Sequence, residues 1–196
     1  MVYRIYVEKK SGLDHEAQNL KNDLSQLLGI RGIQNVRVLN RYDAEGLDRA
    51  LFDYAVKTVF AEPQLDQVCE TLPKADVLFA VEYLPGQFDQ RAASAAECIQ
   101  IISRGERPVV RTAKIYAIDG SLDAEEIEKV KKYVINPVEA REAALDLPET
   151  LAAAYEIPQS VETIEGFCGY SDAQLADLIA ARGLAMDLAD SRCCRA

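Results

Sequence analysis

The chain has 196 residues, 49% of them hydrophobic, and a formal net charge of −10 at pH 7. This length and apolar content suffice for one compact domain or two small ones. The acidic charge argues against nucleic acid, which binds a basic face, and against an anionic membrane surface. The first residues, MVYRIYVEKK, contain no long apolar run. We therefore expect neither a signal peptide nor a membrane span.

The five cysteines are an odd number and are scattered, with one adjacent pair close to the C-terminal residue. Such a pattern does not indicate a disulfide framework, and the adjacent pair lacks the spacing of a redox or metal motif. We therefore expect a soluble, reduced, cytoplasmic protein.

The first third of the chain alternates between strand and helix patterns. Apolar and polar residues alternate over 3–9, which predicts a half-buried strand, and apolar residues at helical spacing predict a helix over 14–28. Residues rich in β-formers predict a second strand at 35–42, followed by a turn at 43–46 and a helix at 47–60. The order is strand, helix, strand, helix.

The next third shows the same order. Strands are predicted at 76–84 and 109–118, and helices at 89–103 and 123–134. The last of these helices begins with residues at capping-box spacing, and its first turn is rich in carboxylates that suit the helix dipole.

The two thirds are also similar residue by residue, because a shift of 74 positions superimposes identical residues without a gap. Glycine and proline are among them, and these fix turn geometry. We interpret the pattern as an internal duplication. The coinciding pairs include Val7 and Val81, Glu8 and Glu82, Gly12 and Gly86, Val36 and Val110, Arg37 and Arg111, Tyr42 and Tyr116, Gly46 and Gly120, and Pro63 and Pro137.

These patterns predict an α+β fold. One unit of 65 to 74 residues would struggle to fold alone, whereas two could join or stack their sheets. We expect a pseudo-dimer with an antiparallel sheet and helices packed on it. The duplicated domain spans 1–144, with one repeat at about 1–72 and the other at about 73–144, and a linker segment with short helices spans 145–196.

Within the linker segment, the Pro-punctuated, Ala-rich stretch 145–158 predicts one short helix. Residues 171–182 predict a clearer helix, since Ser171 and Gln174 have capping-box spacing and Gly183 can end it. The last six residues, SRCCRA, show no pattern.

Residues that carry chemistry are few. The single histidine, His15, falls in the first turn of a predicted helix, where a surface position is the default. No phosphate-binding fingerprint is present. The carboxylates of Asp123, Glu125 and Glu126 could hold a divalent ion, although a solvated helix start is the simpler interpretation. We predict no catalytic, cofactor-binding or metal-binding residue.

Four residues at repeated positions are candidates for an interface or an anion site. Arg37 and Arg111 stand beside valines in equivalent strands and could bind an anion or the carboxylates of a partner domain. The alternative is a salt bridge to the neighbouring helix. Tyr42 and Tyr116 end the same strands, where core or rim packing is the default.

Several strings closely resemble the N-terminal region of phosphoribosylformylglycinamidine synthase, the purine-biosynthesis amidotransferase, in its large single-chain form. The resemblance covers residue 2 to about residue 190. The strings are RIYVEKK (4–10), VRVLNRYD (36–43), TVFAEPQLDQV (58–68), VEYLPGQFDQRAASAAECIQ (81–100), INPVEARE (135–142) and LAMDLAD (184–190).

The resemblance implies a non-catalytic region. In this family a small accessory subunit of other organisms ends a helix in Asn-Pro-Val, as residues 136–138 do here, and the chain looks like two such subunits fused. The family enzyme is a ligase that amidates formylglycinamide ribonucleotide with ATP, magnesium and ammonia from glutamine. Its catalytic residues lie in synthetase and glutaminase domains, which we expect to be the partners of this chain. The SRCCRA tail departs from the family pattern, so we expect either the end of an expressed fragment or a truncated reading frame.

Two other functions remain open. The chain could be a small-ligand-binding regulatory module at the seam of the two repeats, with Arg37 and Arg111 as anion ligands. It could also be an enzyme in its own right, for which the sequence offers almost nothing. We expect a monomer, because an internal duplication already supplies the pairing.

Overall fold

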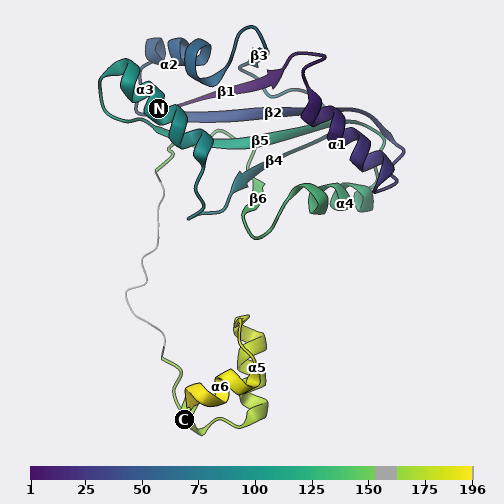
Figure 1. The fold of residues 1–196 in the computed structure, drawn as a ribbon, viewed down its shortest axis with the longest axis vertical. Coiled ribbons are helices and arrows are strands. Elements are labelled where there is room, and N and C mark those ends of the chain that lie inside the picture. Colours follow the sequence, from purple (N-terminus) through teal and green to yellow (C-terminus); the bar gives the residue numbers. More distant parts are fainter. Residues whose placement is uncertain (153–162, 196) are drawn as a thin grey trace. The chain divides into compact units, whose positions relative to one another are not determined.

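The computed structural model describes residues 1–152 and 163–195, which fall into two compact units, 1–153 and 154–196. The first unit is a six-stranded sheet with helices, and the second contains short helices (Figure 1). Among the described residues, no helix is both long and apolar enough to cross a membrane.

The first half of the sheet unit contains three of its strands. Asp48 starts the second helix, because its carboxylate accepts a hydrogen bond from the Leu51 amide at 2.8 Å. The elements are β1 (Val2–Lys9), α1 (His15–Gln26), β2 (Ile33–Glu45), α2 (Arg49–Ala55), the π-helical turn η1 (Val56–Phe60) and β3 (Asp66–Cys69).

The second half has the same order of strands and helices. Asp123 and Glu126 form the predicted capping box, in which each side chain accepts from the other residue's amide. The elements are β4 (Val77–Tyr83), α3 (Gln90–Ser103), β5 (Val109–Gly120), α4 (Ala124–Val134) and β6 (Ala140–Ala143).

The strands form one continuous sheet in the order β3-β1-β2-β5-β4-β6, with antiparallel neighbours throughout. The predicted α+β class and antiparallel sheet are confirmed. At the centre, β2 and β5 pair over most of their length, from Ile33 with Gly120 to Glu45 with Val109. This long central pair joins the two halves of the sheet.

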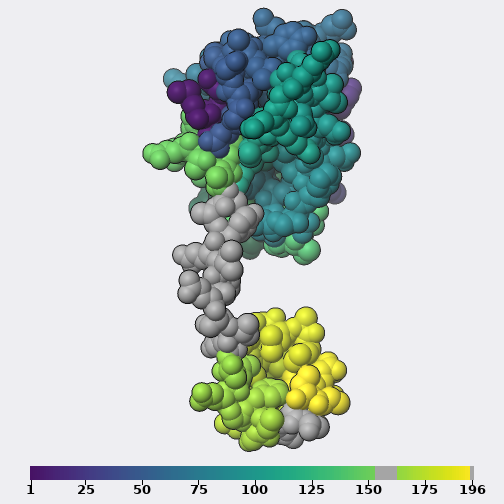
Figure 2. Space-filling model, turned by 90° about the vertical axis from the view of Figure 1, so that its left-hand side faces the viewer, coloured from purple at the N-terminus to yellow at the C-terminus, as the bar shows by residue number. Residues whose placement is uncertain are grey.

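The helices cover one face of the sheet, toward which alternate residues of each strand point. Tyr42 of β2 packs in a cluster with α2 and α3, whereas Val36 of the same strand packs with Leu24 of α1 and Val130 of α4. Figure 1 accordingly shows α2 and α3 over one end of the sheet and α1 and α4 over the other. Figure 2 shows α2 and α3 side by side at the surface.

The opposite face is covered by extended chain. The connection 70–76 leads from β3 to β4, and Leu72 and Ala75 pack there against Leu39 of β2 and Ile115 of β5. Residues 144–152 bind to the same face, where the side chain of Leu151 is buried. The packed chain of this unit therefore continues past residue 144 to at least Leu151.

Four predictions about elements of the sheet unit were wrong. The strands β3 and β6 were missed, β2 runs to Glu45 through the predicted turn at 43–46, and 145–152 contains no helix. The rest of the predicted helix over 145–158 lies outside the described residues. The short strands lack a hydrophobic pattern of their own and form because β1 and β4 each leave an edge to be paired.

The second unit consists of the 3-10 turn η2 (Phe167–Gly169), α5 (Asp172–Arg182) and α6 (Leu188–Arg195). The predicted helix is confirmed, with its Ser171–Gln174 capping box and with Gly183 in the left-handed conformation at its end. The prediction that SRCCRA has no pattern was wrong, because most of it continues α6. Arg192 of α6 pairs with Asp172 of α5 at 2.5 Å, a contact between helices that the local pattern does not show.

Candidate functional site

Charged side chains line the sheet face opposite the helices. We use the name charged face for the charged side chains there, which share this face of β1, β2 and β5 with an apolar cluster around Leu39 and Ile115. Its members are Arg4, Glu8, Arg37, Arg41, Asp43 and Arg111.

Three of these residues form a buried cluster. Arg4 donates two hydrogen bonds to the Asp43 carboxylate, at 2.5 and 2.9 Å, which is the bidentate geometry of a strong ion pair. Arg41 Nε lies 3.2 Å from the same carboxylate but lacks hydrogen-bond geometry, and Nε has no other partner among the described atoms. Burial lowers the pKa of Arg41, and the nearby charge of Arg4 adds to this effect while Asp43 opposes it.

The cluster holds two guanidinium groups against one carboxylate, and each guanidinium also donates one hydrogen bond to the backbone of the chain. Arg41 Nη1 donates to the carbonyl of Ala144 at 2.7 Å, and Arg4 Nη1 donates to the carbonyl of Leu145 at 2.6 Å. The charged face therefore holds residues 144 and 145 of the same chain through arginine-to-carbonyl hydrogen bonds.

Glu45, at the end of β2, holds the same segment further along. Its carboxylate accepts from the Leu151 amide at 2.7 Å and from the Thr150 hydroxyl at 3.0 Å. The hydrogen bond from the Leu151 amide lowers the pKa of Glu45, because it favours the charged carboxylate. Residues 144–151 are thus fixed at both ends.

Arg37 is occupied by an ion pair. Its guanidinium donates to both oxygens of Glu8 on β1, at 2.8 and 2.5 Å, and Gln67 of β3 donates to Glu8 at 3.1 Å. The hydrogen bond to Glu8 raises the pKa of Arg37. The partner is on the neighbouring strand, not on a neighbouring helix as the alternative interpretation assumed. Arg37 is therefore a link between strands.

Arg111 is exposed, and no ion pair or hydrogen bond of its side chain is found among the described residues. The carboxylate at the repeated position, Glu82, is taken by Arg141 of β6 at 2.8 Å. Arg37 and Arg111 are not brought together, because they pair across the β2–β5 seam with Ala117 and Asp43, six positions apart. At about 3.4 Å per residue this separation is roughly 20 Å, too far for one small anion.

Both tyrosines lie on the helix-covered face, not on the charged face. Tyr42 packs on Phe60, and its hydroxyl accepts a hydrogen bond from Arg91 Nη1 at 3.1 Å. Tyr116 stacks on Phe79, and burial together with the charge of Glu16 raises its pKa to about 12. Both rings pack in the core, which is the default that the sequence suggested.

The other candidates from the sequence are in ordinary surroundings. Asp123 and Glu126 are used in the α4 capping box, which favours the helix-start interpretation of that carboxylate group. His15 is the first residue of α1. In the part of the chain that the structure describes, no group of three or more histidine, cysteine or carboxylate side chains is placed to hold a metal ion.

Sequence reasoning missed Arg4, Arg41 and Asp43. Their neighbours in the sequence give no signal, because the carbonyl groups that the two arginines bind are more than a hundred residues away. An alternating strand with charged residues on one side reads as a solvated face. To predict that these charges are buried, one would need to know that a later segment covers the sheet face opposite the helices.

The charged face holds the chain's own segment 144–151. A scan against models of known protein families found no match, and a search of curated proteins found no significant match to this chain.

Proposed function

We propose that this chain is a non-catalytic scaffold and docking domain of a phosphoribosylformylglycinamidine synthase. The synthetase and glutaminase domains of that enzyme would be its partners, and they would supply the ATP, magnesium and catalytic residues. The domain would hold the two activities together so that ammonia from glutamine passes between them. The resemblance of the strings between residues 2 and 190 supports this assignment.

The observation that carries the proposal is the strand register, which favours a duplicated unit. Ile5 pairs with Tyr42, and 74 positions later Phe79 pairs with Tyr116. The short edge strands follow the same offset, since Tyr6 pairs with Cys69 and Ala80 pairs with Ala143. At the seam, the two residues that the offset relates, Asn40 and Lys114, pair with each other.

Such a register is what two fused accessory subunits related by a two-fold axis would give. The axis would pass between Asn40 and Lys114. The helix layer supports the pseudo-dimer further, because Leu24 of α1 packs with Phe79 and Val130 of the second half. Each half then lacks a complete core without the other.

The charged face suits a docking role. Arg4 and Arg41 are taken by the chain's own residues 144 and 145, which leaves the exposed part of this face for a partner. Arg111 on the same face is exposed and offers a guanidinium to carboxylates of a partner domain.

A reconstitution experiment tests the function. A synthetase–glutaminase protein lacking this region is assayed for amidation with and without the added chain. We expect glutamine-dependent activity to rise when the chain is added, because the two activities become coupled. Activity with free ammonium as nitrogen source serves as the control and should change little.

Unchanged glutamine-dependent activity together with the absence of a complex would refute the proposal. An equal rise with ammonium and with glutamine would show stabilisation of the synthetase instead of coupling. ATP hydrolysis or glutaminase activity by the purified chain alone would favour an independent enzyme.

A further inference from the structure

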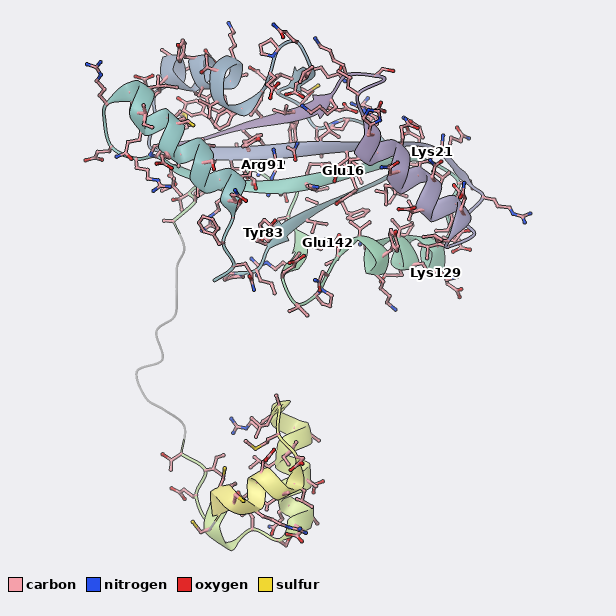
Figure 3. The ribbon with its side chains drawn as sticks, viewed as in Figure 1. Glu16, Lys21, Tyr83, Arg91, Lys129 and Glu142 are labelled. Carbon is pink, nitrogen blue, oxygen red and sulfur yellow. The ribbon has the colours of Figure 1, made fainter. Side chains whose placement is uncertain are left out.

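A pocket of about 560 Å³ lies on the helix-covered side of the sheet. Figure 3 shows Arg91 on α3, Glu16 on α1 and Tyr83 on β4 around this part of the sheet. The floor is the β2–β5 seam, where Asn40 pairs with Lys114. The volume falls within the range of small-molecule sites, about 300–1,000 Å³.

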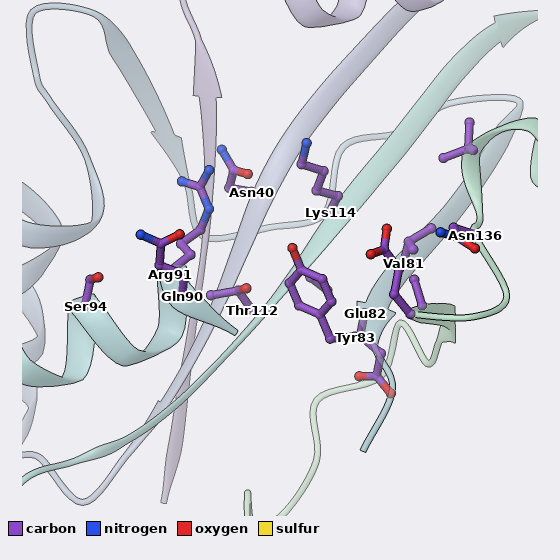
Figure 4. A pocket seen from close by; sticks show the side chains of 14 residues that line it. Asn40, Val81, Glu82, Tyr83, Gln90, Arg91, Ser94, Thr112, Lys114 and Asn136 are labelled. Atoms are coloured by element: carbon purple, nitrogen blue, oxygen red, sulfur yellow. The ribbon is translucent and has the colours of Figure 1, made fainter. Parts of the chain in front are cut away.

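Two cations line the pocket. In the view of Figure 4, Arg91, Asn40 and Lys114 lie on one side of Tyr83, with Glu82 and Asn136 on the other side. The cationic side therefore combines a guanidinium, an ammonium and an amide, which together can bind an oxyanion.

The Arg91 guanidinium is held in place by one hydrogen bond, and its other donors are available to a ligand. Its Nη1 donates to the buried Tyr42 hydroxyl at 3.1 Å, and no other hydrogen bond of this side chain is found among the described residues. Asp89 fixes the start of α3 by accepting from the Ala92 amide and from the Thr112 hydroxyl of β5, at 2.8 and 2.7 Å. Arg91, the second residue of α3, follows this fixed helix start and lines the pocket over the seam.

Lys114 is held more loosely. It pairs with Glu16 of α1, but the two side chains are 41% and 58% exposed. Exposed ion pairs of this kind contribute about 0–1 kcal/mol, so a ligand anion can replace Glu16 at little cost.

Three polar residues of the pocket wall stand where the first half has apolar residues. The residues 74 positions earlier are Ala17, which is buried, and Leu20 and Val38, which are partly buried against the core. A void left by imperfect packing would be lined by apolar groups. This pocket instead carries polar side chains at positions that could have held apolar ones. The equivalent residues of the first and second halves are Ala17 and Arg91, Leu20 and Ser94, and Val38 and Thr112.

We infer that this pocket binds a small organic molecule that carries a carboxylate or phosphate group. Arg91 and Lys114 bind the anionic group, and the body of the molecule lies against Tyr83 and the hydroxyl and amide groups of the wall. The site is separate from the charged face, on the other side of the sheet, and does not depend on the docking function.

Binding is measured on the full chain by amide chemical shifts, with succinate, inorganic phosphate and adenosine monophosphate as probes at millimolar concentration. We expect at least one probe to shift amides of residues 90–94 and 112–114. A response to succinate alone assigns a carboxylate ligand, and a response to either phosphate compound assigns a phosphate ligand. Absence of shifts at these residues with all three probes overturns the inference.

The variant Arg91→Gln should weaken binding of the responding probe by roughly 10- to 100-fold, as loss of a charged hydrogen bond implies. The matched control is Arg104→Gln, which removes the same charge at the other end of α3, outside the pocket. Its affinity should match the wild type. Equal weakening by both variants, or no weakening by Arg91→Gln, would show unspecific ion binding and overturn the inference.

Discussion

At the scale of single residues, the buried cluster of the charged face depends on Asp43. It is 3% exposed and is the carboxylate that neutralises Arg4 and Arg41. Removing one partner of a buried ion pair leaves an uncompensated charge, which costs more than the pair contributes. Here the loss would leave two buried cations facing each other.

We expect Asp43→Asn to lower the free energy of unfolding by about 3–5 kcal/mol, since it leaves Arg4 and Arg41 without a counter-charge. Urea unfolding of the full chain measures the change. Glu128→Gln is the control, because Glu128 is exposed on α4 and its loss should cost less than about 0.5 kcal/mol. Equal stability of Asp43→Asn and the control would contradict the buried cluster.

Tyr116 gives the protein a specific alkaline sensitivity. Its pKa is raised from 10.0 to about 12 in the folded state, so its proton is lost earlier in the unfolded state. The contribution of Tyr116 is therefore fully present below pH 10 and disappears as the pH rises toward 12. The shift corresponds to about 2–3 kcal/mol.

The variant Tyr116→Phe should reduce the loss of stability between pH 10 and pH 12 relative to the wild type. Urea unfolding at a series of alkaline pH values measures it, and phenolate absorbance of the folded protein follows the ionisation. Identical pH profiles of the two proteins would show that Tyr116 titrates normally.

Residue-scale prediction from the sequence succeeded where the partner is close in sequence. The capping pairs Asp123–Glu126 and Ser171–Gln174 are set by a spacing of three residues and were predicted. The Arg4–Asp43 pair spans 39 residues, and its burial depends on a segment beyond residue 143. No local pattern contains that information.

At the scale of elements, the segment 144–152 behaves as a strap across the sheet. Glu45 holds it through the Leu151 amide and the Thr150 hydroxyl. Because the pKa of Glu45 is lowered in the folded state, this contact is present above the ordinary glutamate pKa of about 4.3 and is lost as the pH falls through the lowered value.

The Leu151 amide resonance should therefore titrate with a midpoint below about 4.3, the ordinary glutamate value. The variant Glu45→Ala should abolish the titration, whereas the amides of β5 should be unaffected. A midpoint at or above the ordinary value, or an unchanged titration in the variant, would contradict the contact.

The long elements were predictable, and the short ones were not. The strands β1, β2, β4 and β5 and the helices between them show clear periodicity, so the sequence places them within a few residues. The strands β3 and β6 exist through pairing alone. The segment 144–152 has no regular secondary structure, and its position is fixed by contacts with Arg4, Arg41 and Glu45 of the sheet.

At the scale of the whole molecule, the two halves share their cores. Ala95 and Ile99 of α3 pack with Phe52 of the first half, while Leu24 of α1 packs with residues of the second half. Neither half keeps its core when the other is removed.

A chain of residues 1–72 alone should therefore be unfolded or should self-associate, with a second copy replacing the missing half. Circular dichroism and light scattering distinguish these states. The full chain is expected to be a monomer in the same measurement. A stable, folded monomer of residues 1–72 would contradict the shared core.

The docking function is tested most directly by the mass of the mixture of this chain with the synthetase–glutaminase protein, measured by light scattering. The account predicts a one-to-one complex, which Arg111→Glu on the charged face weakens and Arg104→Glu, at the far end of α3, does not. Two separate proteins in the wild-type mixture would contradict the docking function.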